Sequence, residues 1–369
     1  MDLMTKSIAI ACALALTTAP GTALAWNAAT HAYIAGALHK KAGQTADPQL
    51  LRNRMYGANG PDVFNYAFGQ PFFTIADYLH EYVTPDATLR AWDAARTSGD
   101  ANLIAYAYGF VSHDNAFGAD TTAHVEAITG AVKQGYVIAK AALLAQALRA
   151  VLAQQQMDLP EDQLLLGAHV LAEAAVDLLV QAQLDPEIGV KLRDAVDLAD
   201  PRIGDLLAAA YRAPLARYFA GGEAEAAATI VYVESQFRGI EHQYAEALAA
   251  SRPDAFGPLA QFNAALAERL FDMPAAALYP LVEFGVGQAM TLVQDDFQRE
   301  IFATIRVGER EPRLAGRVAL RWGGARRAPC RDARLALHGW LPSLLQAVRA
   351  GERHELPLEA LEPLAEGRR

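Results

Sequence analysis

The sequence predicts an all-α protein, and three observations support this prediction. Ala and Leu dominate the composition. β-Branched residues rarely alternate with polar ones, as they would in half-buried strands. Long stretches repeat apolar residues with the 3.6-residue period of an amphipathic helix. We therefore expect a bundle of many helices, and the chain shows no internal repeat.

Several segments carry these signals clearly. Pro-Glu-Asp at 160–162 marks a helix start, and Asp-Pro at 200–201 marks a turn. The sequence GANGPD at 57–62 predicts a loop whose glycines allow close backbone approach. The helical period is clearest over residues 134–156, 161–182, 224–251 and 258–270.

The first 25 residues have the features of a secretory signal peptide. Lys6 supplies an early positive charge, residues 7–16 form a short apolar run, and Ala-Leu-Ala at 23–25 matches a cleavage site. Cleavage there gives a periplasmic or secreted protein that begins at Trp26 with a free α-amine. An uncleaved anchor or a buried N-terminal helix is the alternative.

We expect the mature chain to contain a helical domain over residues 26–304 and an extension over 305–369. The extension has many Arg residues and no Lys, and its role is unknown. Cys12 lies in the signal segment, so Cys330 has no partner within the chain and metals are the candidate cross-links.

The net charge and the hydropathy of the sequence bear on whether the protein binds polyanions or spans a membrane. The net charge of −10 does not favour a polyanion binder. No long apolar run follows residue 25, so we expect no transmembrane span. We expect the protein to be a monomer.

Histidines and carboxylates recur at helical spacing in the first half of the chain. Asp120 and His124 are four residues apart, as are His169 and Glu173, so each pair shares one helix face. His113 and Asp120 are seven apart, which predicts the same face two turns away. Zinc binds imidazole nitrogen and carboxylate oxygen. A mature Trp26 would add its α-amine and carbonyl oxygen, and His31 could turn back to join them.

These elements resemble the zinc-dependent phospholipase C family, which shares its fold with zinc-dependent single-strand-specific nucleases. The match is carried by short motifs in the family's order over residues 26–180. They are Trp26 with Thr30-His31, GANGPD ending in Asp62, DYLHEY with His80, AYGFVSHDNAFGAD with His113, Asp120 with His124, and His169-x-x-x-Glu173. The resemblance implies a phospholipase C/nuclease-like helical bundle with about three zinc ions in a metal cleft.

The resemblance also implies a role for each ligand. One zinc would be held by Asp62, His80, His113 and a further Asp, a second by His124, His169 and Glu173, and the third by Trp26 and His31. The family usually has Asp four residues after the first helix His, where this chain has Phe117. Asp120 and Asp114 are both candidates for that ligand, and a short insertion favours Asp120.

The implied function is a secreted zinc-dependent phosphodiester hydrolase. We expect phospholipase C, a lipid-degrading hydrolase that acts on phospholipid at a membrane surface and releases diacylglycerol and a phosphorylated headgroup. Asp62 would be the catalytic residue that orients the attacking water. Glu173 favours the phospholipases, because the nucleases tend to have Asp there. The alternatives are a nuclease or nucleotidase on the same fold and a non-catalytic zinc-binding surface protein.

Two further groups of acidic residues lie outside these motifs. Asp177 continues the Glu173 helix face and is expected to be a polar core residue or to support the ligands. Glu234, Glu241 and His242 are expected on the exposed side of a helix.

Overall fold

The computed structural model confirms the all-α prediction, since every regular element in the residues that it describes is helical and none is a strand. The described residues are 26–41, 47–67, 71–80, 86–115, 118–129, 134–157, 159–250 and 255–308. The signal segment, both cysteines and Phe117 lie outside them. The described helices all belong to the first of two units, which ends at Arg326.

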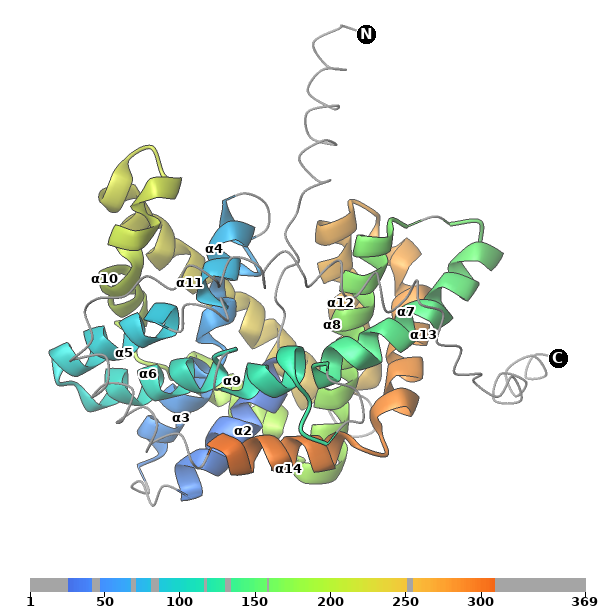
Figure 1. Ribbon diagram of the computed structural model, residues 1–369, viewed down its shortest axis with the longest axis horizontal. Helices are drawn as coiled ribbons and strands as arrows, with labels where there is room; N and C mark the ends of the chain where they lie inside the picture. Colours follow the sequence, from blue (N-terminus) through green and yellow to red (C-terminus); the bar gives the residue numbers. More distant parts are fainter. Residues whose placement is uncertain are drawn as a thin grey trace, which may run out of the picture. The chain divides into compact units, whose positions relative to one another are not determined.

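The elements follow one another along the chain as helices of varied length, joined by short connections (Figure 1). They are α2 (Ala28–Lys41), α3 (Pro48–Gly57), the 3-10 helix η2 (Gly60–Phe64), α4 (Phe72–Leu79), α5 (Asp86–Ser98), α6 (Ala101–His113), the π-helix η3 (Thr121–Val125), α7 (Tyr136–Gln154), α8 (Glu161–Leu179), the π-helix η4 (Val180–Leu184), α9 (Ile188–Asp197), α10 (Ile203–Leu215), the 3-10 helix η5 (Ala216–Tyr218), α11 (Gly222–Ala249), α12 (Phe256–Phe271), α13 (Ala275–Val293) and α14 (Phe297–Gly308).

The four segments with the clearest helical period are confirmed as α7, α8 with η4, α11 and α12, with bounds that agree within two residues. The GANGPD loop is more regular than expected. Gly57 is the last residue of α3, and Gly60 already begins η2. The expected domain boundary at residue 304 falls inside α14, which continues to Gly308.

Helix α8 lies between two groups of elements (Figure 1). It packs against α7, α12 and α13 on one side and contacts α2 on another. Almost every residue from Leu164 to Leu179 is buried, as expected of a helix that is covered all round. His169, Glu173 and Asp177 follow one another at four-residue steps and form one polar stripe on this otherwise apolar helix.

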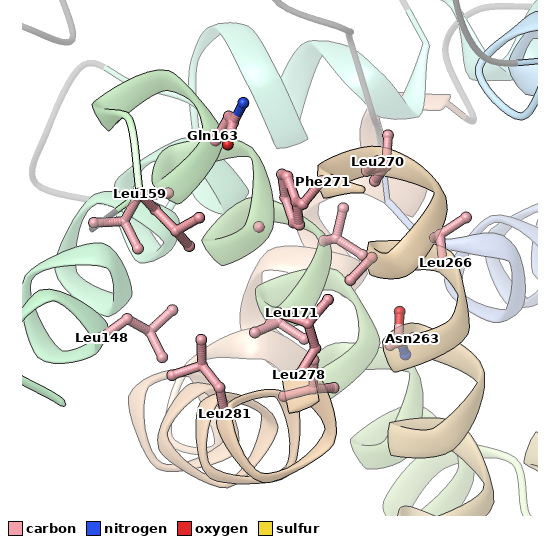
Figure 2. A pocket seen from close by; sticks show the side chains of 15 residues that line it. Leu148, Leu159, Gln163, Leu171, Asn263, Leu266, Leu270, Phe271, Leu278 and Leu281 are labelled. Atoms are coloured by element: carbon pink, nitrogen blue, oxygen red, sulfur yellow. The ribbon is translucent and has the colours of Figure 1, made fainter. Parts of the chain in front are cut away.

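An apolar cavity lies against a different face of α8. Figure 2 shows Leu148, Leu171, Leu278 and Leu281 around it, contributed by α7, α8 and α13. Among the described residues, Gln163 and Asn263 are its only polar lining residues, and none of the residues that line it is charged. We assign this cavity to the packing of α8 against its apolar neighbours, on the side away from His169.

Three described helical stretches are long and apolar enough to cross a membrane, judged by length and composition alone. They are α7, residues 161–184 and α13. The absence of a transmembrane span therefore stays an expectation from the sequence.

Candidate metal centre

His113 reaches the centre because α3 and α6 approach each other closely. Gly57 and Gly109 lie at this contact, where a Cβ atom on either would overlap the backbone of the facing helix. The approach brings the carbonyl oxygen of Ala58 within 2.7 Å of Nδ1 of His113. Donation by Nδ1 leaves Nε2 of this fully buried ring facing the interior.

His80 is oriented in the same way. It follows the last residue of α4, and its Nδ1 lies 2.8 Å from the carbonyl oxygen of Ala76. Its Nε2 lies 3.0 Å from Nε2 of His113 and 3.2 Å from Oδ1 of Asp62. Asp62 is held in η2, and Asn65 donates its side-chain N–H to Oδ1 at 2.6 Å.

The two facing Nε2 atoms favour a cation between the rings. With Nδ1 protonated on each ring, two lone pairs would point at one another across 3.0 Å. Burial lowers the pKa of His113, but Asp120 and Asp62 outweigh it and raise that pKa to about 9. A positive charge is therefore stabilised here, whether it comes from a proton or from a metal ion.

Asp120 lies at the middle of the centre, just before η3, and is fully buried. Its Oδ1 is 3.2 Å from Nε2 of His31, and its Oδ2 is 2.9 Å from Nε2 of His113 and 3.8 Å from Nδ1 of His124. Burial raises its pKa, but His113 and His31 more than offset this and hold the pKa well below its usual value. One carboxylate thus faces three imidazoles from three elements.

Trp26 and His31 enter the site from the start of α2. The indole of Trp26 is fully buried and donates its N–H to the carbonyl oxygen of Ala119 at 3.1 Å, one residue before Asp120. The ring of His31 stacks on that of His113 with centroids 4.2 Å apart. Burial, followed by the neighbouring His113, lowers the pKa of His31, so its ring favours the neutral form that binds metals.

A second group of ligand-type side chains joins η3 to α8. Nε2 of His169 lies 3.3 Å from Nε2 of His124 and 2.7 Å from Oε1 of Glu173. Burial lowers the pKa of His124 well below its usual value. Burial raises the pKa of Glu173 well above its own, with smaller contributions from Asp62 and Asp120. Both shifts favour neutral side chains, and a divalent cation would reverse this balance for the carboxylate.

Three sets of these side chains present their ligand atoms close enough to hold a metal ion: His31 with His113 and Asp120, Asp62 with His80 and His113, and His124 with His169 and Glu173. The residues fit such an ion. Nε2 of His31, both carboxylate oxygens of Asp120 and Nδ1 of His124 are buried, and within the described residues they have no hydrogen-bond partner outside this group of side chains. Buried polar atoms normally have such partners, so these atoms are arranged for a ligand of another kind.

The structure brings together the side chains expected from the motifs, with changes in detail. Asp120 meets His113, whereas Asp114 accepts a hydrogen bond from the hydroxyl of Thr88. The helical reason given for pairing His113 with Asp120 is wrong, because α6 ends at His113 and the backbone of Asp114 is no longer helical. His31 shares Asp120 with His113 instead of standing apart with Trp26.

The expectation that Glu234 and Glu241 lie on an exposed surface is wrong. Both are buried on α11: Glu234 accepts a hydrogen bond from Tyr56 at 2.9 Å, and Glu241 accepts one from Asn59 at 3.2 Å. The signal was present in the sequence, because the two carboxylates lie seven residues apart on the same stripe as Phe237. His242 is partly exposed and pairs with Asp197.

No family model, no curated protein and no solved structure matches this chain. Function is therefore inferred from the geometry of the centre and from the motifs that contain its residues.

Proposed function

We propose that the chain is a zinc-dependent phosphodiester hydrolase, most specifically a secreted phospholipase C. The observation that carries the proposal is the position of Asp120, whose two oxygens face His31, His113 and His124. It connects three adjacent sets of nitrogen and oxygen ligands, which is the donor chemistry that zinc prefers. Grouped metal sites are typical of enzymes that cleave phosphate esters.

Zinc ions bound there would supply Lewis-acid chemistry, polarising a phosphoryl oxygen and making water a better nucleophile near neutral pH. The chain's own part is orientation. Asp62 is the carboxylate nearest to solvent in the first two sets, with 12 % of its side chain exposed. Asn65 and His80 both lie at its Oδ1, so we assign to the other oxygen the proton taken from the attacking water.

A cleft of about 350 Å³ is lined in part by residues that follow Asp62 in the sequence, although Asp62 itself does not line it. Val63 and Tyr66 line it from the Asp62 segment, Phe237 from α11 and Arg269 from α12. Its walls are both polar and apolar, which suits a substrate with a charged phosphodiester and an apolar part. A phospholipid has both, and its cleavage would yield diacylglycerol and a phosphorylated headgroup.

The net charge of −10 supports lipid over nucleic acid as the substrate. The proposal includes a monomer exported by the signal segment and acting at a membrane surface. A nuclease or nucleotidase on the same centre, or a zinc-binding surface protein without turnover, would be the outcome if lipid is not cleaved.

The test compares phosphatidylcholine vesicles with single-stranded DNA, using the zinc-loaded protein in both assays. The proposal predicts release of phosphorylated headgroup from the vesicles and little cleavage of DNA. The reverse preference would establish the nuclease. Failure to cleave either substrate while zinc stays bound would favour the non-catalytic protein.

Asp62→Asn is the sharpest variant for the chemistry. It keeps the size and the bond to Asn65 but removes the proton acceptor, so hydrolysis should fall about 10²-fold or more. Zinc content should be measured in the same sample. Activity within twofold of wild type would rule out the role given to Asp62.

A further inference from the structure

Asp177 is a fully buried carboxylate that the proposed chemistry does not use. It lies on α8, one turn beyond Glu173. Its oxygens accept hydrogen bonds from the backbone N–H groups of Ala29 at 2.9 Å and Thr30 at 2.8 Å. The hydroxyl of Thr30 donates at 2.5 Å and that of Tyr244 at 2.6 Å. Four donors thus converge on one side chain.

Two of these donors are the free N–H groups in the first turn of α2. Such groups have no partner inside their own helix, and a carboxylate there is also favoured by the helix dipole. The carboxylate is supplied here from 147 residues away along the chain. It therefore fixes where α2 begins relative to α8.

The residues on either side of this contact belong to the metal centre. Trp26 precedes the first turn of α2, and His31 follows Thr30 directly. Glu173 lies one turn back on the same helix as Asp177. The Asp177 contact therefore sets the separation between the ligands of α2 and those of α8.

We propose that Asp177 is a positioning residue that holds His31 against Asp120 by anchoring the first turn of α2 to α8. The inference rests on the proposed metal centre. It assigns to Asp177 no contact with substrate or metal.

The carboxylate form suits this role better than an amide. Burial raises the pKa of Asp177 to about 6, and the four hydrogen bonds oppose that rise. The side chain of Asn has one acceptor oxygen and would turn its own N–H groups toward donors. Asp177→Asn should therefore release the start of α2 with little change in side-chain volume.

The experiment measures zinc affinity by competition with a chelator, using the full chain. Asp177→Asn is made in wild type and in a His169→Ala background. The His169→Ala substitution weakens the set formed by His124, His169 and Glu173 (the His124 group), so zinc affinity in that background reports on the remaining ligands. Residues that orient metal ligands typically change affinity by about 10–100-fold. We expect a loss of that size for the zinc held by His31, His113 and Asp120. In the single Asp177→Asn variant, the His124 group should keep wild-type affinity.

A matched pair of tyrosines controls for general destabilisation. Tyr244→Phe removes a buried hydroxyl that donates to Asp177, and Tyr211→Phe removes one that donates to the carbonyl oxygen of Ala87. Tyr244→Phe and Thr30→Val should each weaken zinc binding by a smaller factor than Asp177→Asn, and Tyr211→Phe should not. If Asp177→Asn fails to fold, these variants decide the question.

Two results would overturn the inference. One is zinc affinity in Asp177→Asn within twofold of wild type, and the other is an equal loss in both ligand groups, which a purely structural role would give. Wild-type protein that binds no zinc would overturn the proposed function as well, so the two failures are distinguishable.

Discussion

In two histidines of this centre, one ring nitrogen contacts the backbone and the other faces the neighbouring ligands. In His80 and His113, Nδ1 faces a backbone carbonyl, so Nε2 is directed inward. The carbonyls belong to Ala76 and Ala58, whose side chains take no part. The polypeptide backbone therefore sets the tautomer of two ligands before any ion binds.

Single substitutions can decide whether Asp120 or Asp114 is the aspartate that binds zinc beside His113. Asp120→Asn removes the negative charge that faces His31 and His113, so zinc affinity should fall at least about tenfold. Asp114→Asn is the matched control, since Asp114 is also buried but bonds to Thr88, and its zinc content should stay at the wild-type level. Both are measured by elemental analysis after dialysis. Zinc loss in Asp114→Asn alone would assign the ligand to Asp114.

At the scale of elements, close helix contacts place the ligands. The approach of α3 to α6 carries Ala58 to His113, and α8 presents its polar stripe to α2 while its apolar faces pack against α7, α12 and α13. The glycines on these helices differ sharply. A Cβ at Gly109 would overlap the carbonyl oxygen of Arg54, whereas one at Gly167 would meet only the ring of Phe271 at an ordinary 3.7 Å.

This difference predicts that replacing glycine by alanine has opposite effects on the free energy of unfolding at the two positions. Gly109→Ala should destabilise the protein by about 1–3 kcal/mol through overpacking and should weaken zinc binding. Gly167→Ala should stabilise it by about 0.5–1 kcal/mol, because Ala favours the helix and partly fills the cavity. Urea unfolding of both variants measures the free energy of unfolding. Equal destabilisation by the two would contradict the close α3–α6 contact.

Several of the long helices, and the spacing of ligands along them, could be predicted from the sequence, because amphipathic periodicity and short motifs are local signals. These signals predicted α7, α8, α11 and α12, and they predicted that His169 lies one turn from Glu173. The meeting of His113 with Asp120 could be expected only from the resemblance, since α6 ends at His113 and does not continue toward Asp120. The link between Asp177 and Thr30 spans 147 residues, and no local pattern predicts such a contact.

At the scale of the whole described unit, the centre ties distant parts of the chain together. Its side chains come from α2, η2, α6, η3 and α8, from the residue that follows α4 and from the residue that precedes η3. Ions held by all of them would stabilise the folded state, because the unfolded chain cannot present these ligands together. Metal binding would then cross-link the fold in place of disulfides, because Cys330 is the only cysteine after residue 25.

Chelation of zinc should therefore lower the melting temperature. At free zinc 100 times the Kd, binding to the native state alone contributes about 2.7 kcal/mol. Its removal should lower the Tm by at least about 5 °C. Calorimetry with and without chelator measures the shift. Asp120→Asn should show a smaller shift, and an unchanged wild-type Tm would contradict the structural part of the account.

The most direct test of the central claim is the zinc content per chain of the exported protein, measured together with its N-terminal sequence. The account predicts close to three zinc ions on a chain that begins at Trp26. One ion or none on such a chain would contradict it, because the three ligand sets around Asp120 would then not form a metal centre.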